Sequence, residues 1–186
     1  MPRVKNYNEQ EVLEKAMNLF WKNGYETTSM QQLEKEMGIN KFSIYASFGS
    51  KNGILIESLK CYNRKLQVII SKMKAATGVA AIKQYFYDFV DFSSEKTMFK
   101  GCLITNTANE FIGSVDEIVK KMLTDYTIDV RSAFILKLKE ENVLDQIQIE
   151  QKADYLIIAM FGFSSATRIF NKEQLENYIQ NIFKSV

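Results

Sequence analysis

The stretch "TTSMQQLEKEMGINKFSIYASFGSK", residues 27–51, predicts two short helices joined by a tight turn. Its apolar residues recur three and four positions apart, as on one face of a helix, until Gly38 stops the pattern. Thr28 with Gln31 is expected to cap this helix, and Asn40 can cap the next one directly after the turn. Two helices of about two turns each around a glycine-containing turn form the helix-turn-helix pattern.

The second of these short helices is expected to expose aromatic rings. With residues 40–47 helical, Ile44 and Phe48 lie four apart and can face inward, which leaves Lys41, Phe42 and Tyr45 toward solvent, with Ser47 as a further candidate. Exposed rings gain little from burial, so stability explains this face poorly. Chance is the competing explanation, but Met37 to Ile56 holds two lysines and no acidic residue, as a phosphate-facing surface requires.

A helix entering the major groove of DNA explains this face better. Lys41, Ser43 and Tyr45 can bond phosphates or bases, and Phe42 can contact a thymine methyl group. The helix starts at Thr28 and at Ser50, the latter followed by Lys51, offer backbone amides to phosphates. These residues can equally be plain caps, and the two roles are compatible.

Composition narrows the function classes. The 186 residues suffice for one domain, or for a small domain fused to a larger one, and the net charge of +2 favours no partner. There is no histidine and only Cys61 and Cys102, so the sequence predicts no metal site, no cofactor, no disulfide framework and a reducing cytosol. The apolar run Leu156–Phe163 is too short to span a membrane, and the N-terminus does not look like a signal peptide, so we expect a cytoplasmic protein without a membrane partner.

Helical periodicity runs through the whole chain and predicts an all-α fold. A first helix is expected between Asn8 and Gly24, and a long fourth helix runs from Ser50 to about residue 75. Further helices are expected at roughly 79–95, 102–111, 115–141, 149–170 and 173–184. Ser114 with Glu117 is expected to cap the helix at 115–141, and Asn171 can cap the last helix. The predicted division is a helix-turn-helix DNA-binding domain at residues 1–55 and a larger helical ligand-binding and dimerisation domain at 56–186, joined rigidly inside the fourth helix.

The run "VLEKAMNLFWKNGYETTSMQQLEKEMGINKFSIYASFGSKNGIL", residues 12–55, resembles the N-terminal domain of the TetR family of bacterial transcriptional regulators. The resemblance implies a two-domain all-α homodimer that binds double-stranded operator DNA and releases it when a small molecule enters the second domain. It implies DNA contacts at the positions of Lys41, Phe42, Ser43, Tyr45 and Ser47, with Thr28 and Lys51 near phosphates. Position 42 is often small and position 46 often histidine in that family, whereas this chain has Phe42 and Ala46, so its base preference is expected to differ.

The segment "FKGCLITNTANEF", residues 99–111, resembles a TetR subgroup with a Gly-Cys-Leu signature.

The second domain is rich in aromatic residues. Rings at helical spacing are usually core, but together they favour an apolar or aromatic effector if a pocket exists. The candidate ligand contacts are Phe86, Phe89, Phe111, Tyr126, Phe161, Asn106 and Asn109, with Glu110 and Arg168 as further polar groups. Cys102, between apolar neighbours, is expected to be buried, with an oxidation sensor as the alternative.

The last two helices are the candidate dimer interface. Ala159, Gly162 and Ala166 form a stripe of small residues, and Tyr178 and Ile182 lie on one side of the final helix. These helices can pack as a four-helix bundle with a second copy, or they can simply close the core of one chain.

The sequence therefore predicts a ligand-responsive, dimeric DNA-binding regulator, with repression as the expected outcome. One alternative is a small helical enzyme or carrier, which lacks support because the chain has no histidine, no Gly-rich phosphate loop and no nucleophile with a base nearby. The other is an architectural DNA-binding protein without a sensor.

Overall fold

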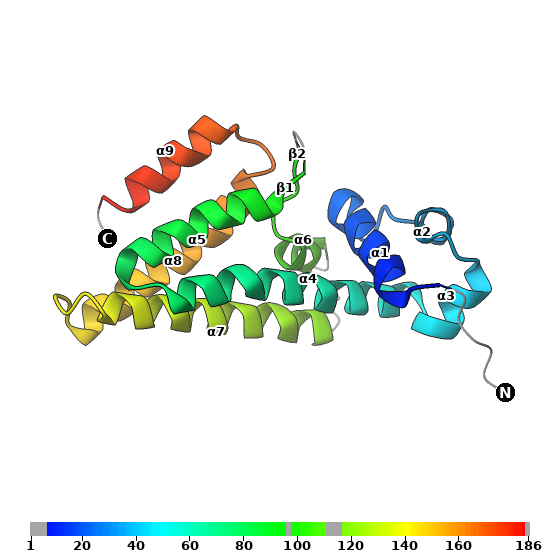
Figure 1. The fold of residues 1–186 in the computed structure, drawn as a ribbon, viewed down its shortest axis with the longest axis horizontal. Coiled ribbons are helices and arrows are strands. Elements are labelled where there is room, and N and C mark those ends of the chain that lie inside the picture. Colours follow the sequence, from blue (N-terminus) through cyan, green and yellow to red (C-terminus); the bar gives the residue numbers. More distant parts are fainter. Residues whose placement is uncertain (1–6, 96–97, 111–116, 185–186) are drawn as a thin grey trace.

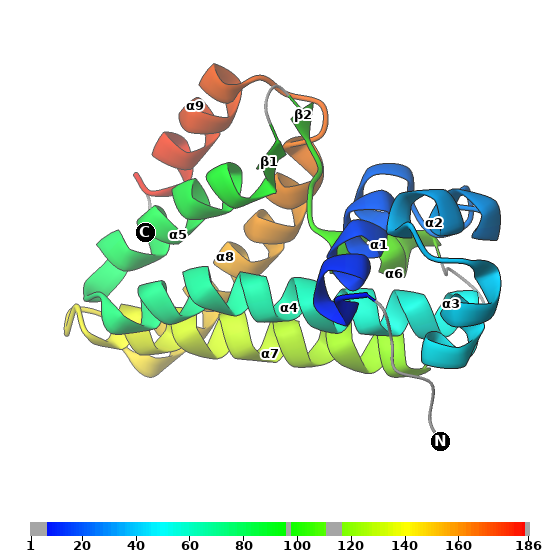
Figure 2. The same cartoon turned by 45° about the vertical axis from the view of Figure 1, so that its right-hand side comes forward.

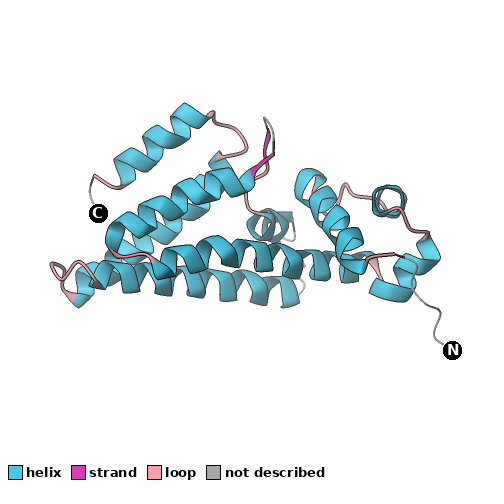
Figure 3. Ribbon diagram, viewed as in Figure 1, coloured by secondary structure: helices cyan, strands magenta, loops and turns pink. Residues whose placement is uncertain are grey.

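The computed structural model describes residues 7–95, 98–110 and 117–184. The described chain is almost entirely helical, which confirms the all-α prediction (Figure 3). The helices are α1 (Glu9–Asn23), α2 (Met30–Met37), α3 (Lys41–Phe48), α4 (Lys51–Ala75), α5 (Gly78–Ser93), α6 (Leu103–Glu110), α7 (Glu117–Lys139), α8 (Gln146–Ala166) and α9 (Lys172–Ile182). A short antiparallel pair, β1 (Ser94–Glu95) and β2 (Met98–Phe99), follows α5 where the sequence predicted the end of a helix and a loop.

Helix starts lie where the capping residues predicted them, with two exceptions. Four predicted caps accept hydrogen bonds from backbone N–H groups in the first turn of the helix that follows them: Asn8, Asn40, Ser50 and Asn171. The start of α2 was predicted one residue too early, because Ser29 and not Thr28 is its cap (see below). α8 begins three residues before the predicted range, where Asp145 and Gln148 form a capping box. The predicted cap at Ser114 lies outside the described residues.

The helices are arranged along one long axis. α4 and α7 lie side by side over most of the molecule, with α1, α2 and α3 at one end and α5, α8 and α9 at the other (Figures 1 and 2). α6 lies between these two groups, next to α1, α4 and α7. No helix in the described part of the chain is both long enough and apolar enough to cross a membrane.

The N-terminal helices share a small core. α1 buries one face, with Phe20 among the most deeply buried residues, against Leu33 and Met37 of α2 and Ile44 of α3. Ile44 is the only fully buried residue of α3, so this helix is held by one anchor and leaves most of its surface exposed.

Trp21 joins this N-terminal unit to the rest of the molecule. The centroid of its indole ring lies 4.9 Å from the ring centroid of Tyr62 on α4 and 5.6 Å from that of Phe92 on α5. The indole N–H donates to the carbonyl oxygen of Gly101 at 3.0 Å. The last turn of α1 is therefore packed firmly against the larger helical part.

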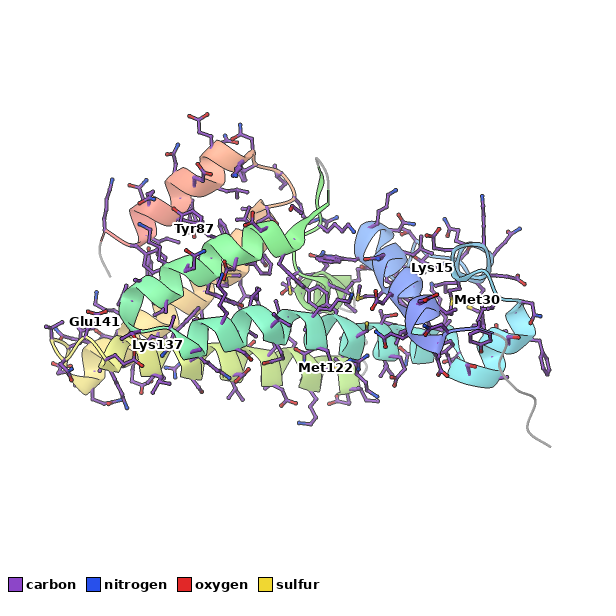
Figure 4. The ribbon with its side chains drawn as sticks, viewed as in Figure 1. Lys15, Met30, Tyr87, Met122, Lys137 and Glu141 are labelled. Atoms are coloured by element: carbon purple, nitrogen blue, oxygen red, sulfur yellow. The ribbon has the colours of Figure 1, made fainter. Side chains whose placement is uncertain are left out.

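The opposite end of the molecule is closed by the end of α7. Thr77 makes no side-chain cap to α5, and the carboxylates of Glu140 and Glu141 instead accept the backbone N–H groups of Gly78 and Val79, each at 2.7 Å. Buried Lys137 donates to Glu140 at 2.8 Å, and Lys137 and Glu141 lie together at this end of α7 in Figure 4.

The predicted dimer stripe on α8 requires a correction. Ala159 is buried, Ala166 packs partly against the core, and Ile182 of α9 is buried within the same chain. Only Gly162 and Tyr178 of the five predicted residues are exposed. The outward face of α8 carries large apolar residues instead, namely Tyr155, Ile158 and, just past the helix, Ile169.

Candidate nucleic-acid interface and junction cleft

α3 presents its residues as the sequence predicted. Phe42 is 74% exposed and Tyr45 42% exposed, while Ile44 between them is fully buried. The ammonium group of Lys41 lies 5.9 Å from the centre of the Tyr45 ring, so the cation and the ring share one face. This arrangement offers a charge, a hydroxyl group and an apolar ring to one partner surface.

Contacts from neighbouring segments hold both ends of α3, and the sequence did not reveal them. The Glu34 carboxylate of α2 accepts the backbone N–H of Lys41 at 2.8 Å, so an acidic group from outside the acid-free stretch reaches the start of α3. The Tyr7 hydroxyl lies 2.6 Å from the Ser47 hydroxyl, which is therefore partly engaged. Ser43 is half-buried, and its backbone N–H donates to Asn40 at 2.8 Å.

Thr28 does not lie where the sequence predicted. Its side chain is fully buried, and its hydroxyl donates to the carbonyl oxygen of Gly24 at 2.6 Å, so it stabilises the turn after α1. The capping box of α2 is Ser29 with Gln32, one residue later than predicted. The buried Thr28 hydroxyl cannot reach a phosphate in this conformation, whereas the exposed start of α2 is still open to one.

The start of α4 lies directly against the end of α3. A Cβ atom at Gly53 would lie 1.9 Å from the carbonyl oxygen of Phe48, so only glycine permits this approach. Ser50 caps the helix by accepting the N–H of Gly53 at 3.0 Å. The Lys51 ammonium lies 4.2 Å from the centre of the Tyr25 ring, which links α4 to the turn between α1 and α2.

A carboxylate from α6 fixes this same turn. Glu110 Oε2 accepts the backbone N–H groups of Tyr25 and Glu26 at 2.8 and 3.0 Å. Gly24, at φ +86°, leaves room for this group, because a Cβ atom there would lie 2.6 Å from Glu110 Oε1. We name the pair of hydrogen bonds the Glu110 latch; it connects the last residue of α6 to the helix-turn-helix unit.

A cleft of about 810 Å³ lies beside the latch. Its walls come from the last turn of α1 and the turn after it, the second half of α6, and the C-terminal end of α8. Of the predicted ligand contacts, Asn106 and Asn109 line this cleft, as do the further candidates Glu110 and Arg168.

The aromatic ligand candidates lie elsewhere. Phe86 and Phe89 are fully buried, and Phe86 packs against Phe134 and Phe163 in the core. The hydroxyl groups of Tyr126 and Tyr85 are 3.2 Å apart, and burial raises the pKa of both phenols. Phe161 is half-buried beside Tyr126, and Phe111 lies outside the described residues. Cys102 is buried, as predicted from its apolar neighbours.

Comparison with known proteins gives related sequences over about six tenths of the chain and similar folds over nearly all of it. The chain is 30% identical over 122 residues to YezE of Bacillus subtilis, an uncharacterized HTH-type transcriptional regulator, covering 64% of this chain and 63% of the relative. It is 28% identical over 109 residues to IcaR of Staphylococcus aureus, a negative regulator of the biofilm operon icaADBC, covering 58% and 59%. The match thus spans only about six tenths of these curated relatives.

Solved structures of low sequence identity share the fold. CifR, a TetR family transcriptional regulator solved as a cysteine mutant with 26-bp operator DNA, has a TM-score of 0.83 at 21% identity and covers 98% of both chains. Reduced NemR of Escherichia coli has a TM-score of 0.77 at 18% identity and covers 94% of both chains. Residues 12–57 match the family described as bacterial regulatory proteins, tetR family, so the N-terminal part of this chain is similar to that family.

Proposed function

We propose that this chain is a dimeric transcriptional regulator, acting as a repressor, that binds operator DNA through α3. The observation that carries the proposal is the outward face of α3, where Lys41, Phe42 and Tyr45 are exposed around a single buried anchor. The match of residues 12–57 to the tetR family supports it. So do IcaR, a negative regulator, and CifR, which was solved with operator DNA. Such a protein works in the cytoplasm and has no enzymatic role.

The proposed contacts follow from where each side chain lies. Lys41, Ser43 and Tyr45 reach phosphates or base edges, and Phe42 lies against a thymine methyl group. Ser47 contributes from the far end of α3, where Tyr7 orients it. Lys51 and the amides at the start of α4 bind a phosphate, while Thr28 supports the turn without touching DNA.

Two copies place their α3 helices in successive major grooves, about 34 to 36 Å apart. The outward face of α8, with Tyr155, Ile158 and Gly162, forms the dimer contact together with Tyr178 of α9.

α4 crosses the proposed domain boundary at residue 55 as one helix of about 37 Å. It transmits the binding of a small effector with an apolar or aromatic body to the spacing of the two α3 helices.

The test starts with selection of bound DNA from a random pool. A double variant, Lys41→Ala with Tyr45→Ala, should lose at least about thirtyfold in affinity for the selected site, because two contacts of about 1–3 kcal/mol each are removed. Both side chains are exposed, so the helical circular dichroism signal should not change. The matched control is Lys139→Ala, an exposed lysine at the end of α7, which should bind as wild type.

Wild-type affinity for the selected site should also fall steeply with salt. The proposal is wrong if no sequence is enriched, if the double variant binds as wild type, or if affinity does not change between low and moderate salt.

A further inference from the structure

We propose that the junction cleft beside the Glu110 latch binds a small organic anion whose acid group pairs with Arg168. This inference rests on the proposed regulatory function and adds to it the location of the effector and one chemical group that the effector must carry. The cleft volume of about 810 Å³ lies within the range of about 300–1,000 Å³ that is usual for small-molecule sites.

Arg168 supplies the positive charge. Its side-chain stem packs against the backbone at Gly101, where an added Cβ would lie 3.1 and 3.2 Å from Arg168 Cδ and Cγ. Across the described ranges of the chain its guanidinium group forms no hydrogen bond or ion pair, whereas Arg131 binds two carboxylates at 2.7 Å each. A guanidinium that is held by its stem and faces a cleft is well placed to bind a carboxylate or phosphate with two parallel hydrogen bonds.

The cleft also stabilises one carboxylate of the chain itself. The adjacent N–H groups of Tyr25 and Glu26 both point at Glu110 Oε2, at 2.8 and 3.0 Å. Two successive amides aimed at one oxygen atom are an anion-binding arrangement, and here they offset the charge of Glu110. Glu26 is exposed to solvent, so the negative charge that opposes a bound anion is partly screened.

Uncharged groups complete the walls. Asn106 and Asn109 of α6 offer carboxamides, and Asn106 is oriented by its hydrogen bond to the Lys100 carbonyl oxygen at 2.9 Å. Phe20, Trp21 and Ile169 give apolar surface on the other sides. The combination fits an acid with a small apolar or aromatic body, because the acid group has a cation and amides, and the body has rings and an aliphatic side chain.

An anion in this cleft lies between α6 and the turn that the Glu110 latch holds. It competes with Glu110 for the amides of Tyr25 and Glu26, and so loosens the latch. The Tyr25 ring contacts Lys51, the residue proposed to lie near a phosphate. A change at the latch therefore reaches the DNA-binding face through one residue, and DNA affinity falls to the extent that the anion prefers the loosened state.

The experiment uses Trp21, which is the only tryptophan of the chain and lines the cleft. Benzoate and hexanoate are titrated at constant ionic strength while the tryptophan fluorescence is recorded, with benzamide and hexanamide as uncharged counterparts. The two carboxylates should give saturable changes, with at least about tenfold tighter binding than the amides, because a charge-assisted bidentate pair is lost in the amides.

Arg168→Gln should reduce carboxylate binding to the level of the amides. Arg64→Gln is the matched control, because Arg64 is an exposed arginine of α4 that does not line the cleft, and it should respond as wild type. Equal responses to acids and amides, no saturable response at millimolar concentration, or unchanged carboxylate binding in Arg168→Gln would each overturn the inference.

The same preparations are tested on the selected DNA site. Wild-type protein that binds DNA but shows no anion response refutes only the cleft inference. Protein that binds the carboxylates through Arg168 but enriches no DNA sequence refutes the proposed regulatory function instead.

Discussion

Glu110 and Tyr25, 85 residues apart in the chain, are joined by a 2.8 Å hydrogen bond from the Tyr25 backbone N–H to the Glu110 carboxylate. The same oxygen atom accepts the N–H of Glu26, so one side chain of α6 fixes two successive amides of the turn between α1 and α2. This turn also carries the Tyr25 ring that contacts Lys51. The Glu110 latch is thus the direct polar connection between α6 and the helix-turn-helix unit.

Replacing Glu110 with alanine should free both amides. Their hydrogen exchange should become at least about tenfold faster than in wild type, because each loses a charge-assisted bond and the turn can open locally. Native-state amide exchange read by NMR measures this residue by residue.

The matched control for the latch is Glu173→Ala, which removes an exposed glutamate from the first turn of α9. It should leave the exchange at Tyr25 and Glu26 unchanged. Unchanged exchange at these amides in Glu110→Ala would show that the latch does not hold the turn in solution.

Gly53→Ala should disrupt the junction of α3 and α4. By helix propensity alone, alanine inside a helix would stabilise the protein by about 1 kcal/mol. Here the new Cβ would lie 1.9 Å from the Phe48 carbonyl oxygen, so the end of α3 must move, and such overpacking costs about 1–3 kcal/mol. We expect a lower free energy of unfolding in urea and weaker binding to the selected DNA site.

The control for Gly53 is Ser71→Ala, because Ser71 is an exposed residue of the same helix and its replacement creates no new close contact. Its unfolding free energy should stay equal to wild type or rise. If both alanine variants were equally stable, the close contact between Gly53 and Phe48 would not exist in solution.

Glu140 should make the stability of the protein depend on pH in the acid range. The hydrogen bond from Lys137, followed by the one from the Gly78 amide, lowers the pKa of Glu140 below its ordinary value of 4.5. Because the folded pKa is the lower one, the carboxylate stabilises the fold fully above about pH 4.5, and this contribution is lost as the pH falls through the folded pKa. Glu140→Gln should therefore be less stable than wild type at neutral pH, with a difference that shrinks in acid.

Urea unfolding of both proteins over a series of pH values measures this difference. A difference between Glu140→Gln and wild type that is the same at every pH would contradict the assignment of the lowered pKa.

Local chemistry explains why so much of the fold could be predicted. Asn8, Asn40, Ser50 and Asn171 cap the helices that follow them, because an N-cap needs only a side-chain oxygen and its own first turn. The exposed face of α3 could be predicted for the same reason, since a helix of two turns with one apolar anchor has only one way to face the core. The cap of α2 could not be chosen in this way, because Thr28 and Ser29 are neighbours and either residue type can cap a helix. Ser29 is the cap because the Thr28 side chain is buried and bonded to the Gly24 carbonyl oxygen.

Long-range contacts explain the rest. The Glu110 latch and the contact of Tyr7 with Ser47 join residues that no local pattern connects. The face of α8 was misassigned because Leu156, Ile157 and Ile158 are consecutive apolar residues, so periodicity does not distinguish the inner side from the outer one. The structure resolves this, since the first two are buried and Ile158 is 71% exposed.

The outward face of α8 exposes large apolar residues around a glycine. Tyr155 and Ile158 are exposed on the helix itself, and Ile169 is 81% exposed just beyond it, although large apolar residues usually gain from burial. Gly162 lies on the same face, and nothing of its own chain comes within 4 Å of its missing side chain. A glycine costs about 1 kcal/mol at such a position, and a close approach of a second helix would compensate for it.

Gly162→Trp should therefore separate the proposed dimer while leaving each subunit folded. The indole fits the monomer, since the position is open within the chain, but it would hold apart two helices packed closely at this glycine. Analytical ultracentrifugation should show a dimer for wild type and a monomer for Gly162→Trp, with equal helical content by circular dichroism. Lys139→Trp, at an exposed site on α7, should remain dimeric. A Gly162→Trp protein that is still a dimer would place the interface elsewhere, and a wild-type monomer would refute the proposed dimer altogether.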